Sequence, residues 1–173
     1  TSLLAMVDAS VGGKTGVDLG ALKNLVGVIN NPKGVVIYPD FLATLPTEEL
    51  RSGMAEMFKH GLISDEGYWH KMCNLSELTE AHLGSLIYES VIIKNEVVTQ
   101  DPTEKGLRKT LNYGHTLGHA IESYCLQNPN RERLLHGEAI AIGMVLATYL
   151  SVKELGFSME KCDEVKAVLG EYF

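Results

Sequence analysis

The chain has 173 residues, with 15 lysines and arginines against 22 aspartates and glutamates, so its formal net charge is −7. Its length suits one domain, and a composition that is 45% hydrophobic and 21% charged argues against an intrinsically disordered protein. The acidic balance argues against nucleic acid or a membrane as partner, because both favour a basic surface. Three widely spaced cysteines without a CxxC pair argue against disulfides and favour a reducing, cytoplasmic setting.

Residues 1–45 predict a loop-rich segment followed by one strand. Five glycines lie between positions 12 and 27, whereas residues 34–38 are rich in β-branched side chains and are closed by Pro39. Because an isolated strand is not stable, we expect this one to belong to a sheet formed elsewhere. The chain begins with Thr1 inside an apolar run, which suggests a cut edge.

From Pro46 onward, the hydrophobic periodicity predicts a helical bundle. The first helix begins near Thr47 as its N-cap. Its apolar face carries Leu50, Met54, Met57, Phe58 and Leu62. Further helices are expected over 79–98, 107–124 and 135–152, and from Ser158 onward. The 135–152 helix is apolar almost all round, which predicts the core of the bundle, and its charge-free part is shorter than the roughly 20 residues of a membrane span. The predicted fold class is mainly α, with residues 46–173 as the helical domain.

One face of the predicted helix over 107–124 carries four polar residues at offsets of 0, 4, 7 and 11, namely Arg108, Asn112, His115 and His119. Such side chains bind anions or metals, whereas an exposed helix face usually carries lysine and glutamate. Gly114 and Gly118 in the same helix indicate close approach of a backbone or a ligand. The alternative interpretation is a polar stripe at a contact between helices.

A zinc site can be built from histidines and one carboxylate. His136 starts the most apolar helix, where a helix dipole keeps an imidazole neutral and able to bind metal. Glu56 would complete a two-histidine, one-carboxylate site that leaves a position open for substrate. Spacing leaves open whether the imidazoles are His115 with His119, or one of them with His136. The alternatives are a capping role for His136 and a surface ion pair between Glu56 and Lys59.

The glycine-rich segment 12–16 does not match a phosphate-binding P-loop, because Asp8 occupies the position of the first glycine. It could instead present Lys14, and later Lys23 and Asn24, to a charged ligand, or it could be a turn with solvated lysines. The remaining histidines, His60, His70 and His82, are assigned to the surface.

Six segments taken together resemble the 3-dehydroquinate synthase family of sugar-phosphate cyclases. They are residues 7–16 (VDASVGGKTG), 23–24 (KN), 44–46 (TLP), 53–56 (GMAE), 111–120 (LNYGHTLGHA) and 136–139 (HGEA). The resemblance implies an enzyme of the shikimate pathway of aromatic amino acid and chorismate biosynthesis. Such a lyase converts 3-deoxy-D-arabino-heptulosonate 7-phosphate to 3-dehydroquinate and phosphate, with NAD+ as a recycled oxidant and Zn2+ or Co2+ as its metal.

The resemblance also implies roles for individual residues. Glu56, His115 and His136 match the metal ligands. His119 matches a contact to the substrate phosphate. Lys94, Arg108 and Asn112 match residues that hold the substrate carboxylate and hydroxyls, and Lys14 and Asn24 match further substrate contacts. Lys59 and Glu104 match other active-site positions. The positions that match the lining of the NAD and substrate cleft are Thr1, Ser2, Asp8, Lys14, Lys23, Phe41, Leu42, Ala43 and Thr44.

Members of this family carry an N-terminal nucleotide-binding domain, which nothing before Thr1 supplies, and further helices are expected after Phe173. We therefore expect a truncated C-terminal domain of a two-domain α/β plus α enzyme, homodimeric when complete and inactive as this fragment. The alternatives are a related cyclase that makes an inosose or a valiolone, a metal-dependent polyol dehydrogenase, and a non-catalytic helical module.

Overall fold

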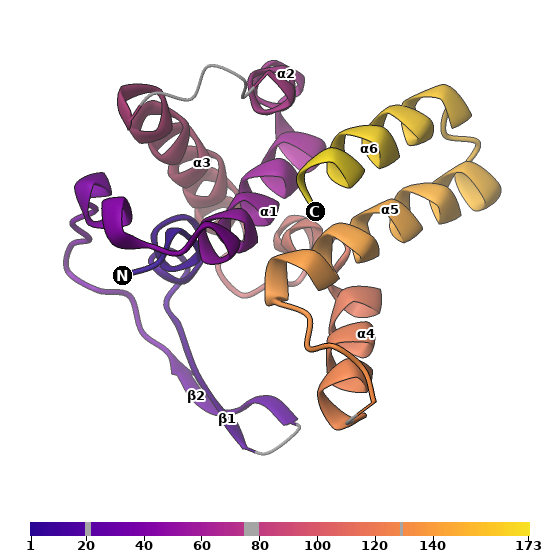
Figure 1. The fold of residues 1–173 in the computed structure, drawn as a ribbon. Helices are drawn as coiled ribbons and strands as arrows, with labels where there is room; N and C mark the ends of the chain where they lie inside the picture. The colour runs from indigo at the N-terminus through magenta and orange to yellow at the C-terminus, as the bar shows by residue number, and fades with distance from the viewer. Residues whose placement is uncertain (20–21, 75–79, 129) are drawn as a thin grey trace.

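The computed structural model describes all residues except 20–21, 75–79 and 129, and only the backbone at residues 18, 22–25 and 80–81. The chain is mainly α, which confirms the predicted fold class (Figure 1). A π-helical turn (Ala5–Ala9) precedes a hairpin of β1 (Lys14–Leu19) and β2 (Leu22–Ile29), and a 3-10 helix (Pro39–Thr44) follows. The helices are α1 (Thr47–Ser64), α2 (Glu66–Cys73), α3 (Glu80–Gln100), a 3-10 helix (Leu107–Asn112), α4 (His115–Gln127), α5 (His136–Leu155) and α6 (Met159–Tyr172).

The helix starts agree with the sequence pattern, with small corrections. Thr47 is the first helical residue and not the N-cap, because the cap position is Pro46 and no side chain caps this end. The predicted start at Thr79 lies outside the described residues. Ser158 does cap α6, since its side chain accepts a hydrogen bond from the Lys161 amide. The short helix α2 was not predicted, although its N-cap Asp65 accepts from the Tyr68 amide at 2.7 Å.

Residues 34–38 are not a strand in this structure, and their place in a sheet formed elsewhere stays a prediction. The described part of the chain instead holds one antiparallel hairpin, in which Lys14 pairs with Ile29 and Leu19 with Leu22. Its glycines suggested a loop, but Gly16 and Gly27 face each other in the ladder. A Cβ on Gly27 would lie 2.5 Å from the Thr15 carbonyl oxygen, so glycine here allows the two strands to approach. Among the described residues none pairs with 34–38, and a strand requires a partner.

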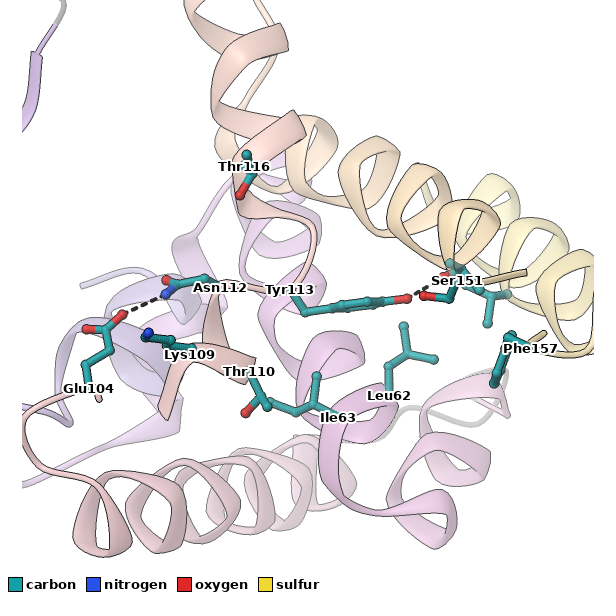
Figure 2. A pocket seen from close by; sticks show the side chains of 12 residues that line it. Leu62, Ile63, Glu104, Lys109, Thr110, Asn112, Tyr113, Thr116, Ser151 and Phe157 are labelled. Carbon is teal, nitrogen blue, oxygen red and sulfur yellow. Dashed lines mark hydrogen bonds between the residues drawn. The ribbon is translucent and has the colours of Figure 1, made fainter. Parts of the chain in front are cut away.

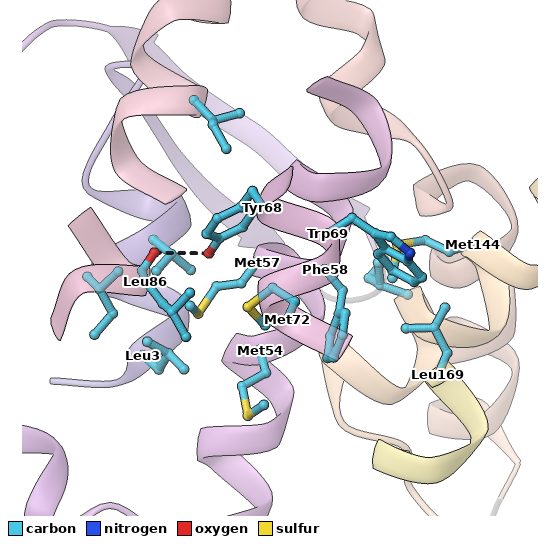
Figure 3. Packing of buried hydrophobic residues seen from close by; sticks show 14 of the residues in the cluster. Leu3, Met54, Met57, Phe58, Tyr68, Trp69, Met72, Leu86, Met144 and Leu169 are labelled. Atoms are coloured by element: carbon cyan, nitrogen blue, oxygen red, sulfur yellow. Dashed lines mark hydrogen bonds between the residues drawn. The ribbon is translucent and has the colours of Figure 1, made fainter. Parts of the chain in front are cut away.

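Helix α1 is the centre of the core, and ten consecutive residues from 52 to 61 are buried. Met54, Met57 and Phe58 from its predicted apolar face pack among side chains of α2, α3, α5 and α6 (Figure 3). The prediction that residues 135–152 form the core helix is wrong in part. One side of α5 is buried at Ile140 and Met144, but Leu150 on its other side is 49% exposed. No helix in the described residues is long and apolar enough to cross a membrane.

Glycines determine how α4 meets α5. The helix predicted over 107–124 is broken at Gly114, whose φ of +77° belongs to the left-handed region. A Cβ on Gly118 would lie 2.9 Å from the Ala139 carbonyl oxygen, and one on Gly143 only 2.0 Å from the Gly114 carbonyl oxygen. The predicted close approach at Gly114 and Gly118 is therefore confirmed, and the approaching backbone is that of α5.

His60 is not a surface residue. It is fully buried, and its Nδ1 lies 2.7 Å from the Ser90 hydroxyl, so the pair joins α1 to α3 inside the bundle. Burial, with the nearby positive charge of Lys59, lowers the pKa of His60 to about 3. The surface assignment of His70 and His82 agrees with the structure, where both are exposed.

We predict that Gly143→Ala destabilises the chain by about 1–3 kcal/mol, because the new methyl group forces α5 away from the Gly114 carbonyl. The matched control is Gly170→Ala in α6, where a Cβ meets no atom within 4 Å. There, alanine should stabilise the helix by up to about 1 kcal/mol. Urea denaturation followed by circular dichroism measures both changes in stability. Equal effects of the two substitutions would contradict the proposed role of Gly143 in the close contact between α4 and α5.

We also predict that the buried imidazole of His60 makes the stability of the chain depend on pH. The pKa of His60 is about 3 in the folded chain, whereas the ordinary value of 6.5 applies to the unfolded chain. Between these two pH values the unfolded chain therefore binds more protons than the folded chain. Stability should therefore fall as the pH decreases, by about 1.4 kcal/mol from this residue between pH values of about 7.5 and 5.5. His60→Gln should flatten this slope in urea titrations, and the control His70→Gln should not. A slope unchanged by His60→Gln would contradict the assignment.

Candidate metal centre and adjoining cavity

Three side chains from three helices converge at one point. Glu56 lies in α1, His115 is the first residue of α4, and His136 is the first residue of α5. One carboxylate oxygen of Glu56, Oε1, lies 3.3 Å from Nε2 of His115 and 3.4 Å from Nε2 of His136. One potential ligand atom from each of the three lies within 4.8 Å of the others. Of the alternatives that spacing left open, the structure therefore brings His115 and His136 to Glu56.

His119 lies beside this group and completes a triangle of imidazoles. Its ring centroid is 5.2 Å from that of His115 and 5.7 Å from that of His136. His119 also forms a second group with Glu122 and His136, again with one potential ligand atom of each within 4.8 Å of the others. The other two residues of the predicted polar stripe, Arg108 and Asn112, precede the break at Gly114 but line the same cavity as His115 and His119.

The carboxylate of Glu56 is fully buried and stays ionised. Burial by itself would raise its pKa, but the charge of Lys59 and the close imidazoles of His115 and His136 hold the pKa well below the usual range. Lys59 Nζ donates to Glu56 Oε2, and the side chain of Lys59 is only 1% exposed. The alternative of a surface ion pair between Glu56 and Lys59 is therefore wrong.

The two candidate histidine ligands present Nε2 to Glu56. Nδ1 of His115 lies 3.1 Å from the Tyr113 carbonyl oxygen, and because a carbonyl only accepts, this contact places the proton on Nδ1.

His136 does not cap α5. The amide of Leu135 donates to the Glu138 side chain and that of Gly137 to the Ser52 hydroxyl, so the imidazole is directed towards Glu56 instead.

A cavity of about 780 Å3 opens beside the three histidines. It is lined by ten of the residues that the sequence singled out, Asp8, Lys14, Lys59, Lys94, Glu104, Arg108, Asn112, His115, His119 and His136. Four of these side chains are lysine or arginine. Two others, Asp8 and Glu104, are carboxylates, so the lining is net positive in a chain with a net charge of −7.

Hydrogen bonds fix several of the lining side chains. Lys94 Nζ donates to Asp8 Oδ1 at 2.5 Å, and Asn112 Nδ2 donates to Glu104 Oε1 at 2.6 Å. Lys14 forms an ion pair with the other oxygen of Glu104. Although partial burial would raise the pKa of Glu104, the bonds from Lys14 and Asn112 lower it. These hydrogen bonds and the ion pair hold the polar wall in place.

Arg108 is 3% exposed and holds two segments together. Its Nη1 donates to the Pro102 carbonyl at 3.0 Å, and its Nη2 donates to the Gly12 carbonyl at 2.8 Å. The loop before it is organised by Asp101, which accepts hydrogen bonds from the amides of Lys105, Gly106 and Arg108. Asp101 was not among the predicted site residues, although an aspartate before a proline at the end of a helix is a turn signal.

Other predicted site residues do not line this cavity. Thr1 is exposed, and the Ser2 hydroxyl accepts from the Ala5 amide. Leu42 and Ala43 line a separate cavity of about 120 Å3. Phe41 and Thr44 lie on the same 3-10 helix and are exposed. Lys23 and Asn24 belong to β2, but their side chains lie outside the described part of the structure.

A second cavity of about 780 Å3 is lined in part by Lys109, Thr110, Asn112 and Tyr113 (Figure 2). Glu104 and Asn112 line both cavities. In the second one, the Tyr113 hydroxyl lies 2.6 Å from that of Thr148, next to Leu62 and Phe157. None of Glu56, His115 and His136 lines it, so the chemistry-bearing residues are grouped at the first cavity.

Two family models match the chain. Residues 1–52 match 3-dehydroquinate synthase N-terminal, and residues 53–172 match 3-dehydroquinate synthase C-terminal. The 3-dehydroquinate synthase of Parabacteroides distasonis is 47% identical over 175 residues, covering 100% of this chain and 49% of the relative. That of a Synechococcus species is 46% identical over 180 residues, covering 99% of this chain and 47% of the relative. The chain thus spans about half the length of these relatives.

Solved structures agree with these matches. The 2-epi-5-epi-valiolone synthase of Streptomyces hygroscopicus, with NAD+ and Zn2+ bound, superposes with a TM-score of 0.82 at 30% identity, covering 98% of this chain and 48% of that one. A 2-deoxy-scyllo-inosose synthase complexed with carbaglucose-6-phosphate, NAD+ and Co2+ superposes with a TM-score of 0.81 at 27% identity. The match covers 99% of this chain and 47% of that one. From the matched models, the relatives and the convergence of the motif residues on one cavity, we conclude that this chain belongs to the 3-dehydroquinate synthase family.

Proposed function

We propose that this chain is the metal- and substrate-binding part of an enzyme that converts 3-deoxy-D-arabino-heptulosonate 7-phosphate to 3-dehydroquinate and phosphate. The observation that carries the proposal is the meeting of Glu56, His115 and His136 beside a cavity lined with cations. Relatives named 3-dehydroquinate synthase at up to 47% identity support this activity. The proposal includes NAD+ as cofactor, a cytoplasmic location and a homodimer for the complete protein.

The donor set suits Zn2+ or Co2+. It comprises two imidazole nitrogens and one ionised carboxylate oxygen, a combination typical of catalytic zinc sites that keep a position open. We propose Glu56, His115 and His136 as the ligands. A metal bound there would supply Lewis acidity to a substrate hydroxyl or ketone.

The lining residues suit an anionic sugar phosphate. We assign Lys94 and Arg108 to charged groups of the substrate and Asn112 to its hydroxyls, because cations and amides bind carboxylates, phosphates and hydroxyls directionally. His119, which faces the cavity, is assigned to the phosphate group, where an imidazole can donate or accept a proton. Lys14, Asn24, Lys59 and Glu104 complete the proposed substrate-binding and catalytic set.

The NAD+ contacts are proposed for residues of the N-terminal segment. Asp8 and Lys14 line the cavity and support this assignment. The other proposed contacts are Thr1, Ser2, Lys23, Phe41, Leu42, Ala43 and Thr44. Because several of them lie away from the cavity, the proposal requires the cofactor to extend beyond the described lining.

We predict that the purified chain binds about one equivalent of zinc and that Glu56→Ala and His136→Ala each abolish stoichiometric binding, because two remaining ligands hold zinc weakly. Metal content after dialysis, measured by mass spectrometry, tests this. The control is Glu154→Ala, an exposed glutamate near the opposite end of α5. Unchanged zinc in the two ligand variants would refute the assignment and favour a non-catalytic helical module.

We also predict that the complete protein releases phosphate from 3-deoxy-D-arabino-heptulosonate 7-phosphate when NAD+ and zinc are present, whereas the 173-residue chain alone does not. The reason is that the chain spans about half of its relatives, and NAD+ binding is proposed to need the remainder. Assays with heptulose and hexose phosphates test the alternative raised by the structural neighbours, a cyclase that makes a valiolone or an inosose. Turnover of only those substrates would contradict the proposed specificity.

A further inference from the structure

Two of the three proposed metal ligands are held from behind by a second group. Glu56 directs Oε1 at the histidines, while its Oε2 accepts from Lys59. His115 directs Nε2 at Glu56, while its Nδ1 donates to the Tyr113 carbonyl. In both cases the atom that does not face the centre has a polar partner that fixes the orientation of the side chain, as is usual around protein-bound metals.

The third ligand, His136, has a carboxylate in the corresponding place. Its Nε2 faces Glu56 at 3.4 Å, and its Nδ1 lies 3.9 Å from Oε2 of Glu122. When a metal takes the lone pair of Nε2, the imidazole proton is on Nδ1, and a carboxylate that faces Nδ1 stabilises it there. The 3.9 Å separation is longer than a hydrogen bond, so at this distance the effect is electrostatic.

The fold determines where Glu122 stands. His115, His119 and Glu122 are at offsets of 0, 4 and 7 in α4, which puts them on one face of the helix. The glycine contacts between α4 and α5 then hold this face against the first turn of α5, where His136 lies. The Glu122 side chain is 16% exposed, so its charge is only partly screened by solvent.

We propose that Glu122 is a positioning residue that orients His136 as a metal ligand, an inference that rests on the proposed function. The same carboxylate could instead hold an ion of its own with His119 and His136, whose ligand atoms also lie within 4.8 Å. The orienting role is favoured because a second ion on Nδ1 would require one imidazole to bind two metals through both nitrogens. Glu122 therefore acts through its partner and does not itself touch substrate.

Zinc affinity of the chain, measured by competition with a chromophoric chelator, tests this proposal. Glu122→Gln keeps the size of the side chain and removes its charge, and we expect about 10- to 100-fold weaker zinc binding. Glu154→Gln removes the same charge from an exposed site and should change the affinity less than about twofold. Urea midpoints of the metal-free variants provide the folding control, because a positioning residue should leave them nearly equal.

A second measurement reads the orientation directly. Long-range proton–nitrogen correlation spectra of the zinc-loaded chain should show the His136 proton on Nδ1, and Glu122→Gln should change the chemical shift of that proton because the charge it faces is removed. The visible spectrum of the Co2+-loaded chain should also change in this variant while remaining that of a single bound ion.

The outcomes separate this inference from the proposed function. If the wild-type chain binds zinc, His136→Ala abolishes binding, and Glu122→Gln leaves both the zinc affinity and the chemical shift of the Nδ1 proton unchanged, the inference is overturned and the metal centre stands. Two bound ions per chain, reduced to one by Glu122→Gln, would overturn it in favour of a second metal site. Absence of zinc binding by the wild-type chain would overturn both proposals.

Discussion

The ionised carboxylate of Glu56 at the centre of the bundle is the constraint around which the described helices are arranged. A buried charge is strongly unfavourable unless it has partners, and Glu56 is fully buried. Its partners come from three places in the sequence: Lys59 one turn further along α1, His115 at the start of α4 and His136 at the start of α5. Satisfying this one group therefore requires α1, α4 and α5 to meet at their present positions.

Glycine makes that meeting sterically feasible. The backbone of α5 lies against Gly114 and Gly118, and Gly143 lies against the carbonyl of Gly114. Any side chain at these positions would push the imidazoles of His115 and His136 apart. Gly114 also ends one helical segment and starts the next, which allows Arg108 and Asn112 to line the same cavity as the histidines although they do not share a helix with them.

Near the candidate metal centre, the interior of the bundle contains buried polar groups that a helical core does not need for its stability. His60 pairs with Ser90, and Lys94 pairs with Asp8 at the edge of the cavity. Buried pairs of this kind rarely add net stability over well-packed apolar side chains. Their placement next to Glu56 and Lys59 instead supports a rigid, preorganised wall for the cavity, which is what recognition of a charged ligand requires.

The sequence alone identified the helical class, most helix positions and the residues that the structure brings together. Periodicity located α1, α3, α5 and α6 because an amphipathic helix repeats its apolar positions every 3.6 residues. It failed for the hairpin, because Gly16 and Gly27 resemble loop residues until the facing strand is seen. It also failed for His60, because burial depends on neighbours in α3 that lie 30 positions away.

Sequence therefore determined which chemical groups this protein has, and only the tertiary structure decided which of them act together. Spacing could not choose between His119 and His136 as the companion of His115, because the i, i+4 rule applies within one helix and the choice depends on how two helices cross. The crossing at Gly114, Gly118 and Gly143 made that choice. It placed His136 against Glu56 on one side and Glu122 on the other, contacts between segments that no local pattern encodes.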